Sequence, residues 1–434
     1  EDALKEFPHH LEEAKKFRND SLIQAIESAD RARMLEWYSK LANTDAGIGQ
    51  RWKEPQTDVS KWDMMNLPGY WADQKPGNVN GAVWFTRMFT VPKALTNKPV
   101  RLELGRIVDQ DSVFLNGKFI GTTGYQYPPR RYDVPPGILA LGENRITIRV
   151  ISQSGRGGFV PDKPYFIAAG SDTVDLKGEW KYKVGTTMNP LPGQTFIRWK
   201  PLGLYNAMIA PLVRFKIAGV IWYQGESNTG AAEEYENLFP ALIKDWRSQW
   251  GVNFPFLYVQ LANFMEPQEQ PLESNWARLR ESQRKALHVP NTGMAVAIDA
   301  GEWNDIHPLN KKIIGERLAR HARKIVYGEE RLTAASPEPA QVSFEANRVV
   351  IQLTNAQGGL QVKGSTLKQF AISADGKQFV WAAARIENTA VIVSNEEVSN
   401  PVAVRYAWAD NPQSANLYNK EGLPVSPFTV FKGK

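Results

Sequence analysis

The residues best suited to chemistry stand just after a short apolar run near position 295. The segment DAGEWNDIHP, residues 299–308, places His307 two residues after the carboxylate of Asp305. A neutral imidazole with a carboxylate on one ring nitrogen is the general base of acyl transfer. We interpret His307 as a candidate base, the alternative being a loop histidine that caps the next helix. The other four histidines lie in charged helical patterns or at a helix end, and we expect solvated surface positions for them: His9, His10, His288 and His321.

A second polar cluster, QGESN at residues 224–228, follows an earlier apolar run. The amide side chains of Gln224 and Asn228, with a close backbone approach at Gly225, are what an oxyanion hole requires. Glu226 offers a carboxylate that would orient a base or a substrate hydroxyl. The alternative is a strand-to-helix turn with Asn228 or Thr229 as the N-cap, and both interpretations can hold together.

Four longer runs around these clusters are individually distinctive. They read LYNAMIAPL at 204–212, GVIWYQGESN at 219–228, LFPALIKDWR at 238–247 and DIHPLNK at 305–311. In this stretch the chain resembles the sialate O-acetylesterase family. The resemblance implies an α/β core of the SGNH-hydrolase type and hydrolysis of O-acetyl esters on sugars, with His307 at the position of the catalytic histidine.

The chain resembles this family but does not contain the family's serine nucleophile. The family uses a serine in a Gly-Gln-Ser-Asn-Met motif, which this chain lacks and which family order places upstream of residue 1. We therefore expect the C-terminal portion of an esterase, whose partner is a missing N-terminal segment of the same gene product. Ser227 is not predicted to replace that serine, because GESNT lacks the final glycine of the G-x-S-x-G elbow. SGNH enzymes carry an Asp three residues before the His, where this chain has Asn304, so the acid stays open between Asp305 and Glu226.

The predicted function is that of a serine-type O-acetylesterase acting on sialic acid or an acetylated polysaccharide such as xylan. A serine of the missing segment would attack the acetyl carbonyl and His307 would take its proton, with no metal or organic cofactor needed. Gln224, Gly225 and Asn228 would bind the oxyanion. One alternative is a glycoside hydrolase that uses Glu226 and Asp305 as paired carboxylates. The other is a non-catalytic carbohydrate-binding protein, which the 14 tryptophans suggest.

The elements that must position these clusters follow from the pattern of residues 191–335. Apolar runs at 220–223, 256–261 and 294–299 are typical of buried parallel strands, and helical patterns alternate with them. The sequence therefore predicts an α/β region whose ligands bind at the carboxyl ends of the strands. Three strands are few for a complete sheet, so we expect the core to be incomplete in this chain.

Shorter alternating runs predict β structure on both sides of this region. Strands are expected at 82–89, 100–104, 112–115 and 145–151, and Asn116-Gly117 predicts a type I′ hairpin. We predict an inserted β-sandwich or jelly roll over 50–190, resembling the sugar-binding domain of certain glycoside hydrolases. A second β-sandwich is predicted over 336–434, and residues 1–49 are predicted to be a helical segment of the α/β core.

Composition excludes several classes of protein. A chain of 434 residues is too long for one core. Its net charge of +6 comes without a long basic run, which argues against a nucleic-acid partner. With no cysteine there is no disulfide, thiolate nucleophile or cysteine metal site, and no apolar run approaches a membrane span. Because the chain opens on Glu1 without an apolar leader, we interpret its N-terminus as trimmed, and we expect a periplasmic or secreted protein.

Overall fold

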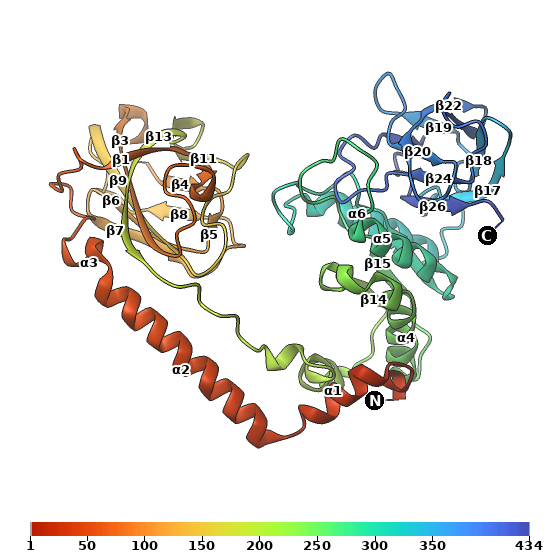
Figure 1. Ribbon diagram of the computed structural model, residues 1–434, viewed down its shortest axis with the longest axis horizontal. Helices are drawn as coiled ribbons and strands as arrows, with labels where there is room; N and C mark the ends of the chain where they lie inside the picture. The colour runs from red at the N-terminus through yellow and green to blue at the C-terminus, as the bar shows by residue number, and fades with distance from the viewer. Residues whose placement is uncertain (1, 97, 434) are drawn as a thin grey trace. The chain divides into compact units, whose positions relative to one another are not determined.

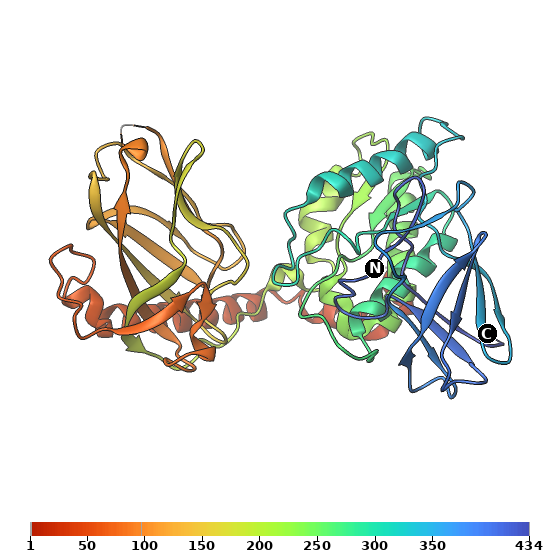
Figure 2. The same cartoon turned by 90° about the horizontal axis from the view of Figure 1, so that it is seen from above.

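The computed structural model describes residues 2–96 and 98–433 and divides into two compact units (Figures 1 and 2). One unit is Glu12–Pro201. The other joins Glu1–Leu11 to Leu202–Lys434, so the first residues of the chain contact its C-terminal half. This division differs from the predicted boundaries at residues 49, 190 and 335.

The Glu12–Pro201 unit contains two antiparallel sheets that share one core. The larger sheet has the order β1 (Asp63–Leu67), β13 (Gly178–Thr187), β3 (Gly81–Val91), β9 (Gly142–Ser152), β6 (Gln110–Leu115), β7 (Lys118–Thr123). The smaller has the order β12 (Asp172–Asp175), β11 (Tyr165–Ala169), β4 (Val100–Leu104), β8 (Arg131–Val134), and a third sheet is formed by β2 (Gly69–Tyr70), β10 (Gly158–Phe159) and β5 (Ile107–Val108). Phe85 and Ile148 of the larger sheet are buried in one cluster with Leu102 and Ile167 of the smaller. A β-sandwich therefore lies where alternating hydrophobicity predicts one.

The hairpin between β6 and β7 has the predicted turn. Asn116 and Gly117 both take positive φ angles, 49° and 79°. A type I′ turn needs left-handed backbone at both central positions, which asparagine and glycine tolerate best. The turn thus sets the register that pairs Leu115 with Lys118.

The long helix α2 (Asp20–Thr44) contacts this sandwich through its C-terminal end, in contrast to the predicted contact with the α/β core (Figure 1). Its buried Trp37 and Leu41 contact a cluster that includes Ile151 and Met188 of the sandwich unit. At its end, Asp45 caps α3 (Ala46–Gly49) and also accepts hydrogen bonds from Trp84 Nε1 at 3.0 Å and Arg149 Nε at 2.8 Å. Trp37 and Leu41 are the buried residues of α2, so the helix contacts the sandwich near its C-terminal end.

The Leu202–Lys434 region begins with a short parallel sheet. Its order is β14 (Val220–Trp222), β15 (Phe256–Val259), β16 (Thr292–Ala295), with all pairs parallel, as predicted. β16 ends at Ala295, earlier than expected, because its partner β15 ends opposite it at Val259. Asp299 therefore lies in a turn beyond the sheet.

Helices cover both faces of this sheet. Helices α4 (Ala232–Trp250) and α5 (Asn275–Lys285) bury Phe239 and Leu279 in one cluster with Phe256 and Tyr258. Helix α6 (Lys311–Ile325) buries Ile314 with Leu257 on the opposite face. This alternation along β15 makes a three-layer α/β arrangement. Pro240 lies inside α4, which begins eight residues earlier at Ala232.

The remaining residues form the predicted C-terminal β structure. One sheet has the order β17 (Pro339–Phe344), β18 (Val349–Leu353), β23 (Ala390–Ser394), β22 (Ala383–Glu387). Another has the order β21 (Val380–Trp381), β20 (Phe370–Ser373), β24 (Ala403–Tyr406), β26 (Phe428–Phe431), and β19 (Leu360–Val362) pairs with β25 (Leu417–Asn419). Ile351 and Phe370 belong to the same buried cluster as Phe239, so this sandwich shares its core with the α/β region. Within the described residues, no helix has the length and apolar character that crossing a membrane requires.

Candidate active site

The first polar cluster leaves β14 through a tightly held backbone. The carbonyl of Gln224 lies 3.4 Å from the Tyr235 hydroxyl and 3.5 Å from Gln283 Nε2. Gln283 is fully buried, and its Oε1 also accepts a hydrogen bond of 2.9 Å from the Leu261 amide. This one glutamine of α5 therefore ties the loop after β14 to the loop after β15. Its role was missed in the sequence, where it appears only as a member of a helical pattern.

Residues beyond Gln224 turn into a short 3-10 helix, η7 (Glu226–Ala231). The Glu226 side chain accepts a hydrogen bond of 2.9 Å from the Gly225 amide, and its backbone carbonyl accepts one from Thr229 Oγ1. The Asn228 amide donates to the Gly225 carbonyl at 2.9 Å. The turn interpretation of this motif is thus confirmed in outline, without a side-chain cap from Asn228 at η7. Glu226, Asn228 and Gln224 remain partly exposed, so their side chains are accessible to a ligand.

The second cluster lies on a loop that begins after β16. Glu302 and Asp305 form an isolated antiparallel bridge, and the Asp305 amide donates to the Glu302 carbonyl at 3.2 Å. Asp305 is 3% exposed, and its Oδ1 accepts a hydrogen bond of 2.9 Å from the His307 amide. His307 itself is exposed. A buried carboxylate thus shapes the turn that presents the imidazole.

This loop is anchored by the loop after β15. The Asn263 side chain accepts a hydrogen bond of 2.8 Å from the Gly301 amide, and the Met265 amide donates to the Trp303 carbonyl at 2.9 Å. A Cβ at Gly301 would lie 2.0 Å from the Asn263 carbonyl oxygen. Only glycine allows the two loops to approach this closely.

Lys311, the first residue of α6, lies beside both clusters. Its Nζ is 4.7 Å from the centre of the Tyr223 ring, next to Gln224. Partial burial lowers the pKa of Lys311, while the charges of Glu226, Asp305 and Glu302 act in the opposite direction. Burial and the Glu226 charge also raise the pKa of Tyr223 to about 12. The two predicted clusters therefore follow β14 and β16, the outer strands of one parallel sheet, and the Lys311 charge acts on carboxylates of both clusters.

Asp299 at the start of this loop and His321 of α6 have structural roles. Asp299, at the start of the predicted cluster, binds Arg317 through two hydrogen bonds of 2.6 and 2.8 Å. Burial raises the pKa of Asp299, but the hydrogen bonds from Arg317 outweigh it and the net shift is downward.

The expectation of a solvated His321 was wrong: this residue is 5% exposed, and its Nε2 donates to the Met294 carbonyl at 2.9 Å. Gly293 leaves the space for its ring, since a Cβ there would lie 2.6 Å from His321 Nδ1.

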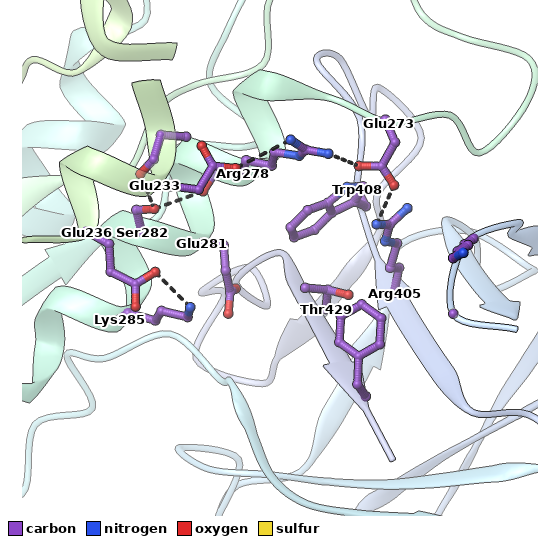
Figure 3. A pocket seen from close by; sticks show the side chains of 14 residues that line it. Glu233, Glu236, Glu273, Arg278, Glu281, Ser282, Lys285, Arg405, Trp408 and Thr429 are labelled. Carbon is purple, nitrogen blue, oxygen red and sulfur yellow. Dashed lines mark hydrogen bonds and ion pairs between the residues drawn. The ribbon is translucent and has the colours of Figure 1, made fainter. Parts of the chain in front are cut away.

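A separate cleft of about 500 Å³ lies among α4, α5 and the C-terminal sandwich (Figure 3). Arg278 pairs with Glu273 at 3.0 Å, and Glu273 pairs with Arg405 at 2.6 Å, so ion pairs cross the cleft (Figure 3). On the neighbouring wall Lys285 pairs with Glu236 at 2.8 Å. The charged side chains named above form ion pairs with one another, and neither Glu226 nor Asp305 lines this cleft. We interpret this region as a packing interface between the α/β layer and the C-terminal sandwich.

Two parts of the chain match known protein families. Residues 177–324 match the family of carbohydrate esterases described as sialic acid-specific acetylesterases. Residues 21–176 match the sugar-binding domain of glycosyl hydrolases family 2. The first range contains both polar clusters and the second contains most of the sandwich. The region that holds both polar clusters is therefore similar to carbohydrate esterases of this kind, as the sequence motifs predict.

Individual relatives extend this result. The chain is 34% identical to the sialate O-acetylesterase of Mus musculus over 251 residues, which is 52% of this chain and 46% of the relative. The Homo sapiens sialate O-acetylesterase is 32% identical over 52% of this chain and 48% of its own length. This chain thus spans about half the length of these curated relatives. A crystal structure of a carbohydrate acetylesterase from Xanthomonas citri is 29% identical, with a TM-score of 0.52, and the match covers 79% of this chain and 99% of that one.

Proposed function

We propose that this chain is the histidine-bearing portion of an O-acetylesterase that removes acetyl groups from carbohydrate. The observation that carries the proposal is the position of His307 and the Gln224–Asn228 loop at the carboxyl edge of one parallel sheet, with Lys311 beside both. Ligands of open α/β sheets bind at this edge. The likeness to sialate O-acetylesterases and to the Xanthomonas citri carbohydrate acetylesterase supports the same reaction.

In the proposed mechanism His307 is the general base. It takes the proton of a serine hydroxyl as the oxygen attacks the acetyl carbonyl, and returns it to the departing sugar oxygen. It then activates water to release acetate from the acyl-enzyme. We assign Asp305 as the residue that positions His307, because its buried carboxylate already holds the His307 backbone amide. Gln224 and Asn228 would donate to the oxyanion, with Gly225 allowing the close approach.

We propose that the serine comes from another segment of the same protein. The chain has no Gly-Gln-Ser-Asn-Met motif, and Ser227 lies in η7 rather than at a nucleophile elbow. In the described residues β14 is an edge strand with Ile221 69% exposed. An unpaired apolar edge is a template for a further strand. A strand of the serine-bearing segment would cover it and bring the nucleophile to the sheet edge beside Gln224.

We propose that the substrate is an acetylated sialic acid or an acetylated polysaccharide such as xylan. The family-2 likeness of residues 21–176 supports a carbohydrate ligand but does not discriminate between the two. The direct comparison is acetate release by the complete gene product from each substrate. Release from neither, with cleavage of aryl glycosides instead, would favour the glycoside hydrolase, with Glu226 and Asp305 as its acid and base.

The decisive experiment replaces His307 by Ala in the complete gene product. Loss of a general base predicts at least a ~100-fold fall in the rate of nitrophenyl acetate hydrolysis, with little loss of stability because the side chain is exposed. His288→Ala is the matched control, since His288 is also exposed but belongs to neither cluster and contacts the Lys285 carbonyl at the end of α5. Near-normal hydrolysis by the His307 variant would disprove the proposed role.

A further inference from the structure

Two histidines and one glutamate converge within the second unit, away from the candidate active site. The helix α1 (Pro8–Lys16) begins with His9 and His10, and Glu234 lies in the first turn of α4. His9 Nε2 is 2.8 Å and His10 Nε2 is 3.4 Å from the same oxygen, Glu234 Oε1. The two imidazole rings lie 4.0 Å apart, tilted by 42°. Three side chains from two helices thus direct their ligand atoms at one point.

We propose that His9, His10 and Glu234 form a binding site for a divalent transition metal, with Zn²⁺ as the best fit. All three ligand atoms lie within 4.8 Å of one another. Zn–N and Zn–O bonds of 2.0–2.2 Å in tetrahedral geometry separate neighbouring ligand atoms by about 3.3 Å. The two distances to Glu234 Oε1 bracket that value, so small rotamer changes would admit an ion.

The chemistry of the donors favours zinc over harder cations. Two imidazole nitrogens and one carboxylate oxygen suit Zn²⁺ and its neighbours in the first transition row, whereas Ca²⁺ and Mg²⁺ prefer all-oxygen sites. His9 is 63% exposed, and the side chains of His10 and Glu234 are 28% and 26% exposed. An ion can therefore enter from solvent, and water would complete its coordination.

The position of the site suggests what the metal does. Glu234 lies three residues after the end of η7, the short helix that contains Glu226 and Asn228. The 3-10 helix η1 (Asp2–Glu6) precedes α1, and Ala3 and Glu6 line a cleft together with Glu236 and Pro240 of α4. A metal would therefore fasten the start of the chain to the first turn of α4. The proposed ion is structural, and the inference does not depend on the proposed esterase activity.

The test measures metal binding directly on the 434-residue chain after treatment with a chelator. Titration with Zn²⁺ in competition with a chromophoric chelator should show one saturable site, and Co²⁺ should give visible absorption bands. His10→Ala and Glu234→Gln should each weaken binding at least about tenfold, because each removes one of three protein ligands. Zn²⁺ should also raise the melting temperature of the unmodified chain but not of these variants.

His288→Ala and Glu233→Gln are the matched controls. His288 is an exposed histidine of the same unit, and Glu233 is an exposed carboxylate adjacent to Glu234. Both variants should bind Zn²⁺ with unchanged affinity. Absence of a saturable site in the unmodified chain, or undiminished binding by Glu234→Gln, would overturn the proposal. In that event the cluster is a histidine–carboxylate ion pair and nothing more.

Discussion

The Nζ of Lys311 lies 4.7 Å from the centre of the Tyr223 ring, which joins the residue after β14 to the first residue of α6. The same cation interacts with the charges of Glu226, Asp305 and Glu302. Two loops that are almost eighty residues apart in the chain therefore share one electrostatic environment. This arrangement has consequences that can be measured.

Replacing Lys311 by Met should lower kcat/KM of the complete enzyme. The lysine charge interacts with carboxylates of both loops, and the substitution removes that interaction from the candidate site. We expect a fall of up to about tenfold, which corresponds to about 1.4 kcal/mol of lost charge interaction. Lys312→Met is the control, because Lys312 is 88% exposed and its side chain pairs only loosely with Glu316. Equal losses in both variants would show that the position of Lys311 has no special effect.

Replacing Gly301 by Ala should displace the loop that carries His307. The new Cβ would lie 2.0 Å from a backbone oxygen of Asn263, which cannot move independently of its own loop. Overpacking of this kind costs about 1–3 kcal/mol, and we expect esterase activity to fall as well. Gly315→Ala provides the contrast: this exposed site in α6 has open space, and the change should stabilise by about 0.5–1 kcal/mol. Urea unfolding and ester hydrolysis measure both effects, and an unaltered Gly301 variant would contradict the clash.

Replacing Asp45 by Asn should destabilise the Glu12–Pro201 unit. The Asp45 side chain is fully buried and pairs with Arg149, whose side chain is 14% exposed. Removing one partner of a buried pair leaves an uncompensated charge, at a cost of about 3 kcal/mol. Asp73→Asn interrupts an exposed pair with Arg156 and should change stability by less than about 1 kcal/mol. Similar losses in the two variants, measured by urea unfolding, would argue against a special role for Asp45.

The buried His321 should make stability depend on pH. Burial lowers its pKa to about 4, whereas the unfolded chain protonates it near its ordinary value of 6.5. The unfolded state then binds more protons between these values, so this contribution is complete above pH 6.5 and is lost as the pH falls toward 4. The loss amounts to about 3 kcal/mol. His321→Gln keeps a hydrogen-bond donor for the Met294 carbonyl but does not titrate. Its unfolding free energy should therefore fall less steeply than that of the unmodified chain across this range, and identical pH profiles would be the contrary result.

Local patterns in the sequence determined most of the secondary structure and the location of the candidate site. The strand predicted at 100–104 has those bounds in the structure, and Asn116-Gly117 specified its hairpin through backbone sterics. The polar residues at 224–228 and 299–308 could be assigned to one sheet edge because parallel strands all end there. The family motifs, which describe local sequence, pointed to the esterase class that the comparisons support.

Tertiary structure decided which surfaces those elements meet. The helical spacing of apolar residues in α2 did not identify which of them are buried, and long-range packing placed Trp37 against the β-sandwich. The sequence pattern predicts a surface position for His321. In the structure its ring is buried, because Gly293, on a strand twenty-eight residues earlier, has no side chain to occupy that space. The neighbours of Lys311 and of the His9–His10–Glu234 cluster likewise come from segments that are distant in the sequence. Periodicity reports whether a side chain is buried, whereas the identity of its neighbour depends on how distant segments pack, and that information is not contained in any local window of the sequence.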